Sequence, residues 1–585
     1  MRKPLLSALL LSCVVLGLLS LVPGYNVHEA GFVSGDTAEK IDQYLERITP
    51  FGFAGALLVA KDGEIILNKG YGLAIRKDNV FNSKDTVFST GSITKQFTAA
   101  GIMKLEMSGR LDTSDTITKF FQSVPEDKKS ITLHHLLTHT SGVVDMVGGD
   151  YEKAERDETV RKILARPLQF EPGEEFAYSN GGYSILAAVI EMVSGEPYEK
   201  FMFKNLFEPA GMFFTGYRRP DWTERTVAHW YVENKDNGTP LGKNYPYWNL
   251  LGNGGILSTT SDMYRWHLAL LDEGILSSKV KRKMFTPVLN EYGYGWDILD
   301  TDRGILIQHD GGSMLGNSAE FRRYIDARAV SILFCNQAFE GRPLFDAVRD
   351  RIEVLIFDGD VPVPPKVKGN TDNEISEEMT GLFEMKGGGS LQIREEDGRL
   401  LVRGTDRRTE ALLFGADPDD LDTYERLNEI SETIFSEALE GNFEPFFENM
   451  ANREDRAGPV KDLIRERLEM SRPRTGDIEE VKALRTIPEF FRGKKTAFTS
   501  VELKGREGSL FFGLIWEGDK NIGVRTMMAP SSVRIPFLPV TDMEFAGYHL
   551  AAGKVLTLHF VRKNERIAGI LLSSGAGEIS AGKKN

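Results

Sequence analysis

The segment from Ser89 to Leu105 constrains the fold most strongly, because it is a helical pattern that is apolar on most sides and still carries a lysine. Its sequence is STGSITKQFTAAGIMKL, and its apolar residues leave no wide polar face. A helix that is hydrophobic all round is normally buried among other elements. Lys95 therefore lies where an unpaired amine costs stability, and its presence there needs a reason.

The chain has 585 residues, which is too long for one compact core and predicts several domains. Its net charge is -14 and it has no cluster of Lys and Arg, which argues against nucleic acid as a partner. Residues 1–24 begin with MRK, and an apolar run follows. This pattern predicts export to a secreted, periplasmic or extracellular location. The segment is either cleaved as a signal peptide or kept as a membrane anchor.

Residues 358–375 form the predicted linker, because the prolines of VPVPP deny the hydrogen bonds of helices and sheets. Residues 36–357 before it form one domain, with strand patterns at both ends and helical patterns between them. This order predicts an α+β fold in which an antiparallel sheet formed by the terminal strands is flanked by helices. Cys335 falls in one of these strand patterns, and we expect it to be a small core residue.

Residues 376–585 predict a mainly-β accessory region with an α+β insert. Residues 376–415 and 533–585 alternate apolar and polar side chains around turns, which is typical of antiparallel strands, and we interpret them as two parts of one β-barrel. Residues 416–532 contain helical patterns followed by four strand patterns. That order resembles a cone-shaped NTF2-like module, and a single irregular α+β accessory domain is the alternative.

Ser92 and Lys95 form a Ser-x-x-Lys pair, and the same motif occurs at Ser278–Lys281 and Ser580–Lys583. Because roughly two matches arise by chance in a chain of this length, their surroundings must distinguish them. The other two lysines lie in polar sequence, and we expect them to be solvated. Desolvation lowers the pKa of a lysine in general, and a neutral amine one turn from a hydroxyl can take its proton. The alternative is that Ser92 only caps the helix and Lys95 extends to solvent.

A second candidate segment, EPGEEFAYSNGGY, precedes an apolar run that predicts a buried helix ending near Gly195. Tyr178 and Asn180 therefore lie where a loop enters a helix. A third segment, HDGG, begins at His309 and ends a strand pattern. Its glycines let a ligand approach the strand backbone closely.

Taken in order, these three motifs make the chain resemble the serine β-lactamase and penicillin-binding-protein superfamily, in its class C β-lactamase-like branch. That branch includes β-lactamases, D-stereospecific peptidases and esterases. The stretches LLTHTSG, from Leu136, and NGGILSTTSD, from Asn253, support the resemblance. It covers residues 36–357, and the accessory region lies outside it.

The resemblance implies that Ser92 is the acylated nucleophile, that Lys95 activates it, and that Tyr178 shuttles protons. It also implies four substrate-binding residues. These are Asn180 for a substrate amide, His309 for the substrate or the Tyr178 hydroxyl, and Gly311 and Gly312 for the substrate backbone. The backbone amides of Ser92 and Gly312 would form an oxyanion hole. The family implies a structural role for His139. No metal or other cofactor is expected, and the partner is a small-molecule or peptide substrate.

His309 departs from the pattern of efficient β-lactamases, which carry a lysine at that place. An imidazole is largely neutral at pH 7 and anchors a carboxylate poorly. The expected function is therefore an exported serine hydrolase of peptides, amides or esters, such as a D-aminopeptidase, carboxypeptidase or esterase. A β-lactamase and a catalytically weak cell-surface binding or sensing protein are the alternatives. By analogy with barrel-bearing relatives, the accessory region is expected to gate or extend the site.

Overall fold

The computed structural model describes residues 31–232, 234–243, 245–338, 343–368, 375–386, 388–491, 494–527, 535–550, 553–574 and 577–584. The predicted signal peptide or anchor, residues 1–24, lies outside these ranges. Within them, every helix is too short or too polar to cross a bilayer.

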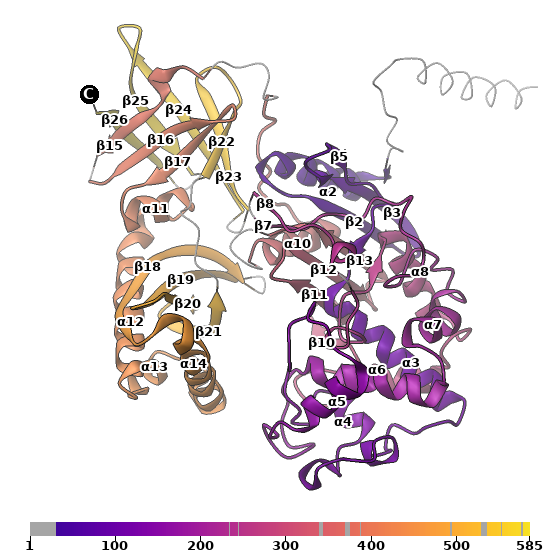
Figure 1. Ribbon diagram of the computed structural model, residues 1–585. Helices are drawn as coiled ribbons and strands as arrows, with labels where there is room; N and C mark the ends of the chain where they lie inside the picture. The colour runs from indigo at the N-terminus through magenta and orange to yellow at the C-terminus, as the bar shows by residue number, and fades with distance from the viewer. Residues whose placement is uncertain are drawn as a thin grey trace, which may run out of the picture.

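The first domain is built on a seven-stranded antiparallel sheet with the order β1-β3-β2-β13-β12-β11-β10 (Figure 1). Strands from the two ends of the domain meet in its centre, where Gly55 pairs with Cys335 and Lys61 pairs with Ala329. The predicted sheet of terminal strands is thus confirmed. The strands are β1 (Phe32–Val33), β2 (Gly55–Lys61), β3 (Glu64–Tyr71), β10 (Asp297–Thr301), β11 (Gly304–Ser313), β12 (Asn317–Tyr324) and β13 (Ala329–Cys335).

The two faces of this sheet carry different layers of helices, because successive side chains of a strand point to opposite faces. Leu58 and Ile332 pack on one side into the core that contains α3 and α6. Leu57 and Leu333 pack on the other side against α2 (Asp36–Ile48) and α10 (Pro343–Ile356). Helices of the first layer are α3 (Thr94–Met107), α4 (Leu133–Leu137), α5 (Arg156–Leu164), α6 (Asn180–Ser194), α7 (Tyr198–Met202), α8 (Thr260–Leu271) and α9 (Ser278–Met284).

Short strands connect the helical layer to the sheet. They pair locally as β4 with β5, β6 with β9, and β14-β7-β8. Their bounds are β4 (Leu73–Ile75), β5 (Val80–Phe81), β6 (Phe88–Ser89), β7 (Tyr231–Val232), β8 (Lys235–Asp236), β9 (Leu257–Ser258) and β14 (Gln337–Ala338).

The accessory region contains a closed antiparallel barrel with the order β15-β16-β17-β22-β23-β24-β25-β26. Its interior is filled by apolar side chains such as Phe383, Phe537 and Phe560, all of them buried. The strands are β15 (Gly381–Met385), β16 (Ser390–Glu396), β17 (Arg399–Gly404), β22 (Ile535–Pro539), β23 (Glu544–His549), β24 (Lys554–Lys563), β25 (Arg566–Ser573) and β26 (Glu578–Lys583).

Helices and a four-stranded antiparallel sheet occupy the chain between β17 and β22. One face of this sheet packs on α12, where Phe435 lies 4.8 Å from Phe512 between ring centroids. The likeness to an NTF2-like module stays a prediction. The elements are α11 (Arg407–Leu413), α12 (Leu421–Leu439), α13 (Glu444–Glu448), α14 (Arg453–Thr475), β18 (Ile478–Phe491), β19 (Lys494–Gly505), β20 (Ser509–Glu517) and β21 (Lys520–Met527).

The barrel packs on the α2–α10 layer of the first domain. Leu538, Tyr548 and Leu550 belong to the same apolar core as these helices. Two polar contacts accompany it. The Arg351 guanidinium of α10 donates to the Leu550 carbonyl at 3.2 Å, and the Tyr548 hydroxyl lies 3.5 Å from that of Tyr44. The contact therefore lies on the sheet face opposite to α3.

Replacement of Leu550 tests this contact. Leu550 is buried in the joint core, so Leu550→Ala should lower the free energy of unfolding by about 2–5 kcal/mol. Leu271→Ala, at an exposed position of α8, should change it by less than about 0.5 kcal/mol. Urea unfolding followed by circular dichroism measures both values. Equal effects of the two variants would show that the barrel does not depend on this contact.

Candidate active site

Ser92 lies in a short turn, Gly91–Ile93, that leads directly into α3. Thr90 anchors the turn, since both its backbone N–H and its hydroxyl donate to the Ile256 carbonyl at 2.8 Å. Gly91 has a φ of 53°, and a Cβ there would lie 2.3 Å from the backbone nitrogen of Gly312. Only a glycine fits this close approach of the turn to β11. Ser92 itself is partly exposed.

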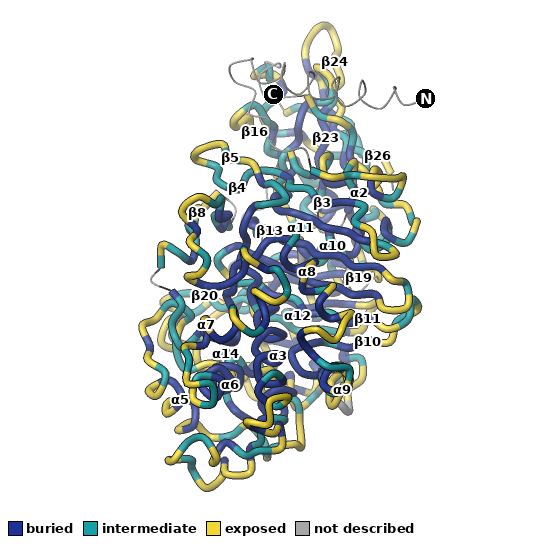
Figure 2. The backbone as a smooth tube through the Cα atoms, turned by 90° about the vertical axis from the view of Figure 1, so that its right-hand side faces the viewer, coloured by how far each residue is buried: buried dark blue, intermediate teal, exposed yellow. Residues whose placement is uncertain are grey.

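Lys95 is completely buried one turn after Ser92 (Figure 2 shows most of α3 as buried). Its Nζ donates to Ser92 Oγ at 3.2 Å, to Asn180 Oδ1 at 2.6 Å and to the Asn253 carbonyl at 2.7 Å. Hydrogen bonds to a charged group contribute about 1.5–3 kcal/mol each. Three of them can offset the several kcal/mol that burial of an ammonium group costs. The alternative in which Lys95 extends to solvent is wrong.

Asn180 is the first residue of α6, and Asp145 fixes the orientation of its side-chain amide. Asp145 Oδ1 accepts hydrogen bonds at 2.9 Å from both the backbone N–H and Nδ2 of Asn180. Asn180 Oδ1 is thereby turned toward Lys95. Ser179 caps the helix by accepting from Gly182 N–H at 2.9 Å, and the helix ends at Gly195 as predicted.

Asn253 is a second buried support that the sequence motifs did not identify as a site residue. Its carbonyl accepts from Lys95, while its Nδ2 donates to Ser184 Oγ at 2.9 Å and to the Asn249 carbonyl at 2.8 Å. Sequence reasoning did not assign a role in the site to Asn253 or Asp145. Asn253 opens one of the stretches that support the family resemblance, and no sequence signal marks Asp145.

Tyr178 is exposed at the surface of the site, with an exposed fraction of 36%. The Lys95 Nζ lies 4.6 Å from the centroid of its ring. A cation at that distance stabilises the electron-rich face of an aromatic ring. The structure therefore brings Ser92, Lys95, Tyr178 and Asn180 together from two distant segments.

The end of β11 lies directly against the Ser92 turn. A Cβ at Gly311 would lie 2.2 Å from the Thr90 carbonyl oxygen and 2.5 Å from the backbone nitrogen of Ser92. β12 pairs with β11 along residues 306–313, whereas β10 pairs only with residues 304–308. The β10 side of residues 309–313, including Gly312, is therefore the strand edge next to Ser92.

His309 is buried, and protein groups engage both of its ring nitrogens. Nδ1 lies 2.6 Å from the Asp310 carbonyl oxygen, and Nε2 lies 3.0 Å from the Tyr292 hydroxyl. Because a carbonyl oxygen only accepts, we assign the hydrogen to Nδ1. Its ring centroid lies 6.4 Å from that of Tyr178. Tyr292 is a partner that the sequence did not predict.

His139 is buried beside Tyr178, with 4.3 Å between the ring centroids. The sequence motif gave it only a structural role, yet it is in direct contact with a predicted site residue. Burial and the nearby Lys95 and His309 hold the pKa of His139 well below its usual value. The ring is therefore neutral.

The expectation that Lys281 is solvated is wrong. Lys281 is buried in the middle of α9, and its Nζ donates to the Leu270 carbonyl at 3.2 Å and to the Asp272 carbonyl. The reason is that α9 packs against the carbonyl end of α8, which its polar sequence does not reveal. Ser278 instead bonds to the Glu273 carboxylate. This Ser-x-x-Lys pair thus caps a helix end.

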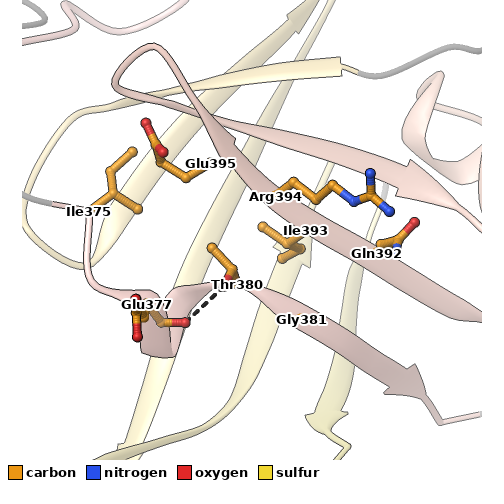
Figure 3. Close-up of a pocket in the computed structure, with 8 residues that line it drawn as sticks. All are labelled: Ile375, Glu377, Thr380, Gly381, Gln392, Ile393, Arg394 and Glu395. Carbon is orange, nitrogen blue, oxygen red and sulfur yellow. Dashed lines mark hydrogen bonds between the residues drawn. The ribbon is translucent and has the colours of Figure 1, made fainter.

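A hollow of about 500 Å³ lies elsewhere, on the barrel (Figure 3). None of the predicted site residues lines it. Its lining residues are Ile375, Glu377, Thr380, Gly381, Gln392, Ile393, Arg394 and Glu395.

The fold and the Ser-Lys-Tyr grouping define a serine hydrolase with a β-lactamase/transpeptidase fold. A family model described as Beta-lactamase matches residues 46–355, which is more than half of the chain. The chain belongs to the Beta-lactamase family.

Two curated relatives come from Bacillus subtilis (strain 168). PbpX is 36% identical over 263 residues, which are 45% of this chain and 65% of PbpX. Penicillin-binding protein 4* is 32% identical over 380 residues, which are 60% of this chain and 83% of that protein. The chain thus spans just under two thirds of the first relative and most of the second.

The solved structure of the octameric penicillin-binding protein homologue from Pyrococcus abyssi resembles nearly the whole chain. It covers 93% of this chain and 100% of its own, at 19% identity and a TM-score of 0.50. At this identity the likeness concerns the fold alone.

Gly311→Ala tests the contact between β11 and the Ser92 turn. The added Cβ would meet backbone atoms of Thr90 and Ser92, so the turn must shift by several tenths of an ångström or more. We expect acylation of Ser92 to slow by about 100-fold. Labelling rates with a fluorophosphonate probe measure this. Gly242→Ala, where a Cβ meets open space, is the matched control and should keep the wild-type rate.

Asp297 of β10 predicts a pH dependence of stability. Burial, together with the Asp310 and Glu320 carboxylates, raises its pKa from 3.8 to about 7. Between these two values the folded state holds a proton that the unfolded state lacks, so stability falls as the pH rises from 4 to 7. Relative to the wild type, the free energy of unfolding of Asp297→Asn should therefore increase by about 2–4 kcal/mol as the pH rises through this range.

Urea unfolding at pH 4, 5.5, 7 and 8 measures the difference between Asp297→Asn and the wild type. Asp300→Asn, at an exposed position of the same strand, is the control and should leave the difference constant. A constant difference for Asp297→Asn as well would show that this carboxyl does not titrate in the range.

Proposed function

We propose that this chain is an exported serine hydrolase that forms an acyl-enzyme on Ser92 with a peptide, amide or ester substrate. One observation carries the proposal. A buried lysine amine donates to the hydroxyl of a partly exposed serine, in a helix whose residues are nearly all buried. A stabilising role alone does not require the serine to stay open to solvent.

The proposed reaction begins when Ser92 gives its hydroxyl proton to the neutral form of Lys95, or to the phenolate form of Tyr178 that a Lys95 ammonium group would stabilise, while Oγ bonds to the substrate carbonyl carbon. The carbonyl oxygen gains negative charge, and the backbone N–H groups of Ser92 and Gly312 stabilise it. The bond from carbon to the leaving nitrogen or oxygen then breaks. Tyr178 returns the proton to the leaving group, and a water molecule releases the acyl group by the same steps in reverse.

The exposed edge of β11 supports a substrate with an extended backbone. Residues 309–313 offer backbone groups beside Ser92, and a peptide can pair with such an edge as an added strand. His309, with both nitrogens engaged by protein groups, gives no permanent positive charge for a carboxylate. This combination favours D-aminopeptidase or esterase activity over β-lactam hydrolysis, and carboxypeptidase activity, whose substrate ends in a carboxylate, stays an alternative.

Acylation by penicillin is the second candidate activity, because both curated relatives have penicillin-binding protein in their names. We propose that penicillin reacts with Ser92 as a slowly released acyl donor. The apolar run after MRK supports export.

Ser92→Ala and Lys95→Met test the proposal directly. Both should lose labelling by fluorophosphonate and by fluorescent penicillin by at least about 1000-fold, because they remove the nucleophile or its base. The second Ser-x-x-Lys pair provides matched controls, since Ser278→Ala and Lys281→Met alter the same residue types on α9. Labelling that survives in Ser92→Ala would falsify the proposal. Failure of the wild type to turn over esters, D-amino-acid amides and β-lactams would favour the binding or sensing alternative.

A further inference from the structure

His139 holds the segment that carries Tyr178 at three points. Its carbonyl accepts from the Ala177 N–H at 2.9 Å, and its Nδ1 accepts from the Ser179 N–H at 3.0 Å. Between these two anchors, its ring packs against the ring of Tyr178 with an interplanar angle of 36°. The residues before and after Tyr178, and Tyr178 itself, are thus fixed by one side chain and its backbone.

The His139 backbone is itself unusual for a residue with a side chain. Its φ is 57°, in the left-handed region that costs free energy for a non-glycine residue. Such a conformation persists only where the surroundings impose it. Here it allows the carbonyl and the ring of one residue to reach the same loop.

The His139 ring has a defined hydrogen position. Because Nδ1 accepts from a backbone amide, the ring hydrogen lies on Nε2. In the described part of the chain Nε2 has no hydrogen-bond acceptor, and the ring is fully buried. Its neighbours are aromatic: Tyr292 lies 4.7 Å and Tyr183 5.1 Å away between centroids. A buried donor without an acceptor costs about 1–3 kcal/mol, so another advantage must keep histidine here.

Tyr178 supplies that advantage, because it is exposed while its neighbours Lys95 and His309 are buried. A proton shuttle must stay within hydrogen-bond reach of the groups it serves. An exposed phenol on a loop loses this placement unless something rigid supports it. The buried ring of His139 is such a support.

We infer that His139 is a positioning residue for Tyr178, acting as a neutral imidazole that holds the phenol ready for proton transfer. The inference rests on the proposed function. It assigns no chemical step to His139. Its effect on the reaction passes through Tyr178 alone.

A double-mutant cycle tests this inference with a p-nitrophenyl ester as substrate. His139→Asn keeps an acceptor near the Nδ1 position and accepts a positive φ, and it removes the ring. We expect kcat to fall by about 10- to 100-fold with KM changed by less than about 3-fold. In the Tyr178→Phe background the same replacement should lower kcat by less than about 3-fold, because its target is already gone.

An alternative replacement of His139 and a control variant accompany the cycle. His139→Phe keeps the ring and removes the acceptor, and it serves if His139→Asn does not fold by circular dichroism. Because the Ser179 N–H then loses its acceptor, we expect a loss of kcat in the wild-type background here too, and the same near-neutral effect in Tyr178→Phe. His549→Asn, at a histidine of β23 in the barrel, is the control and should leave kcat unchanged.

The outcomes distinguish a failure of the inference from a failure of the proposed function. Equal losses from His139→Asn with and without Tyr178 would overturn the inference, as would a wild-type kcat in Tyr178→Phe alone. In both cases Ser92-dependent turnover remains, so the proposed function stands. If the wild type shows no Ser92-dependent turnover, the proposed function fails and the inference fails with it.

Discussion

The burial of the Lys95 amine is the constraint on which the rest of the first domain depends. An amine inside an apolar helix is tolerable only when polar acceptors surround it, and here they come from Ser92, Asn180 and Asn253. These acceptors lie up to 158 residues away along the chain. The start of α6 and the loop before β9 must therefore be held against α3, and the same contacts that make Lys95 tolerable also assemble the site.

Much of this arrangement could be predicted because its signals are local. The central sheet follows from the strand patterns at both ends of the domain, and the end of α6 follows from Gly195. The supports of the site could not be predicted, since Asp145 and Tyr292 act through contacts that only the fold creates. Lys281 is predicted to be solvated because its sequence is polar. The sequence does not reveal that the end of α8 packs against it.

The two faces of the central sheet separate the site from the accessory region. α3 and α6 pack on one face, and the barrel packs through Tyr548 and Leu550 on the α2–α10 layer of the other face. The contacts of the barrel with the first domain thus join its outer layer, across the sheet from Ser92. The barrel therefore packs against the domain on the side of the sheet opposite to the site. These contacts give no support for a role of the barrel in gating the site.

We propose that His309 influences which substrates suit the site. A lysine at this position would keep a positive charge for a substrate carboxylate at any physiological pH. His309 instead has Nδ1 at the Asp310 carbonyl and Nε2 at the Tyr292 hydroxyl, and an imidazole gives a carboxylate no permanent charge. We therefore propose that recognition comes from the strand edge at residues 309–313. Backbone groups bind the extended backbone of a substrate whatever the charge of that substrate. This arrangement supports our proposal of a peptide or ester substrate over a small anionic ring.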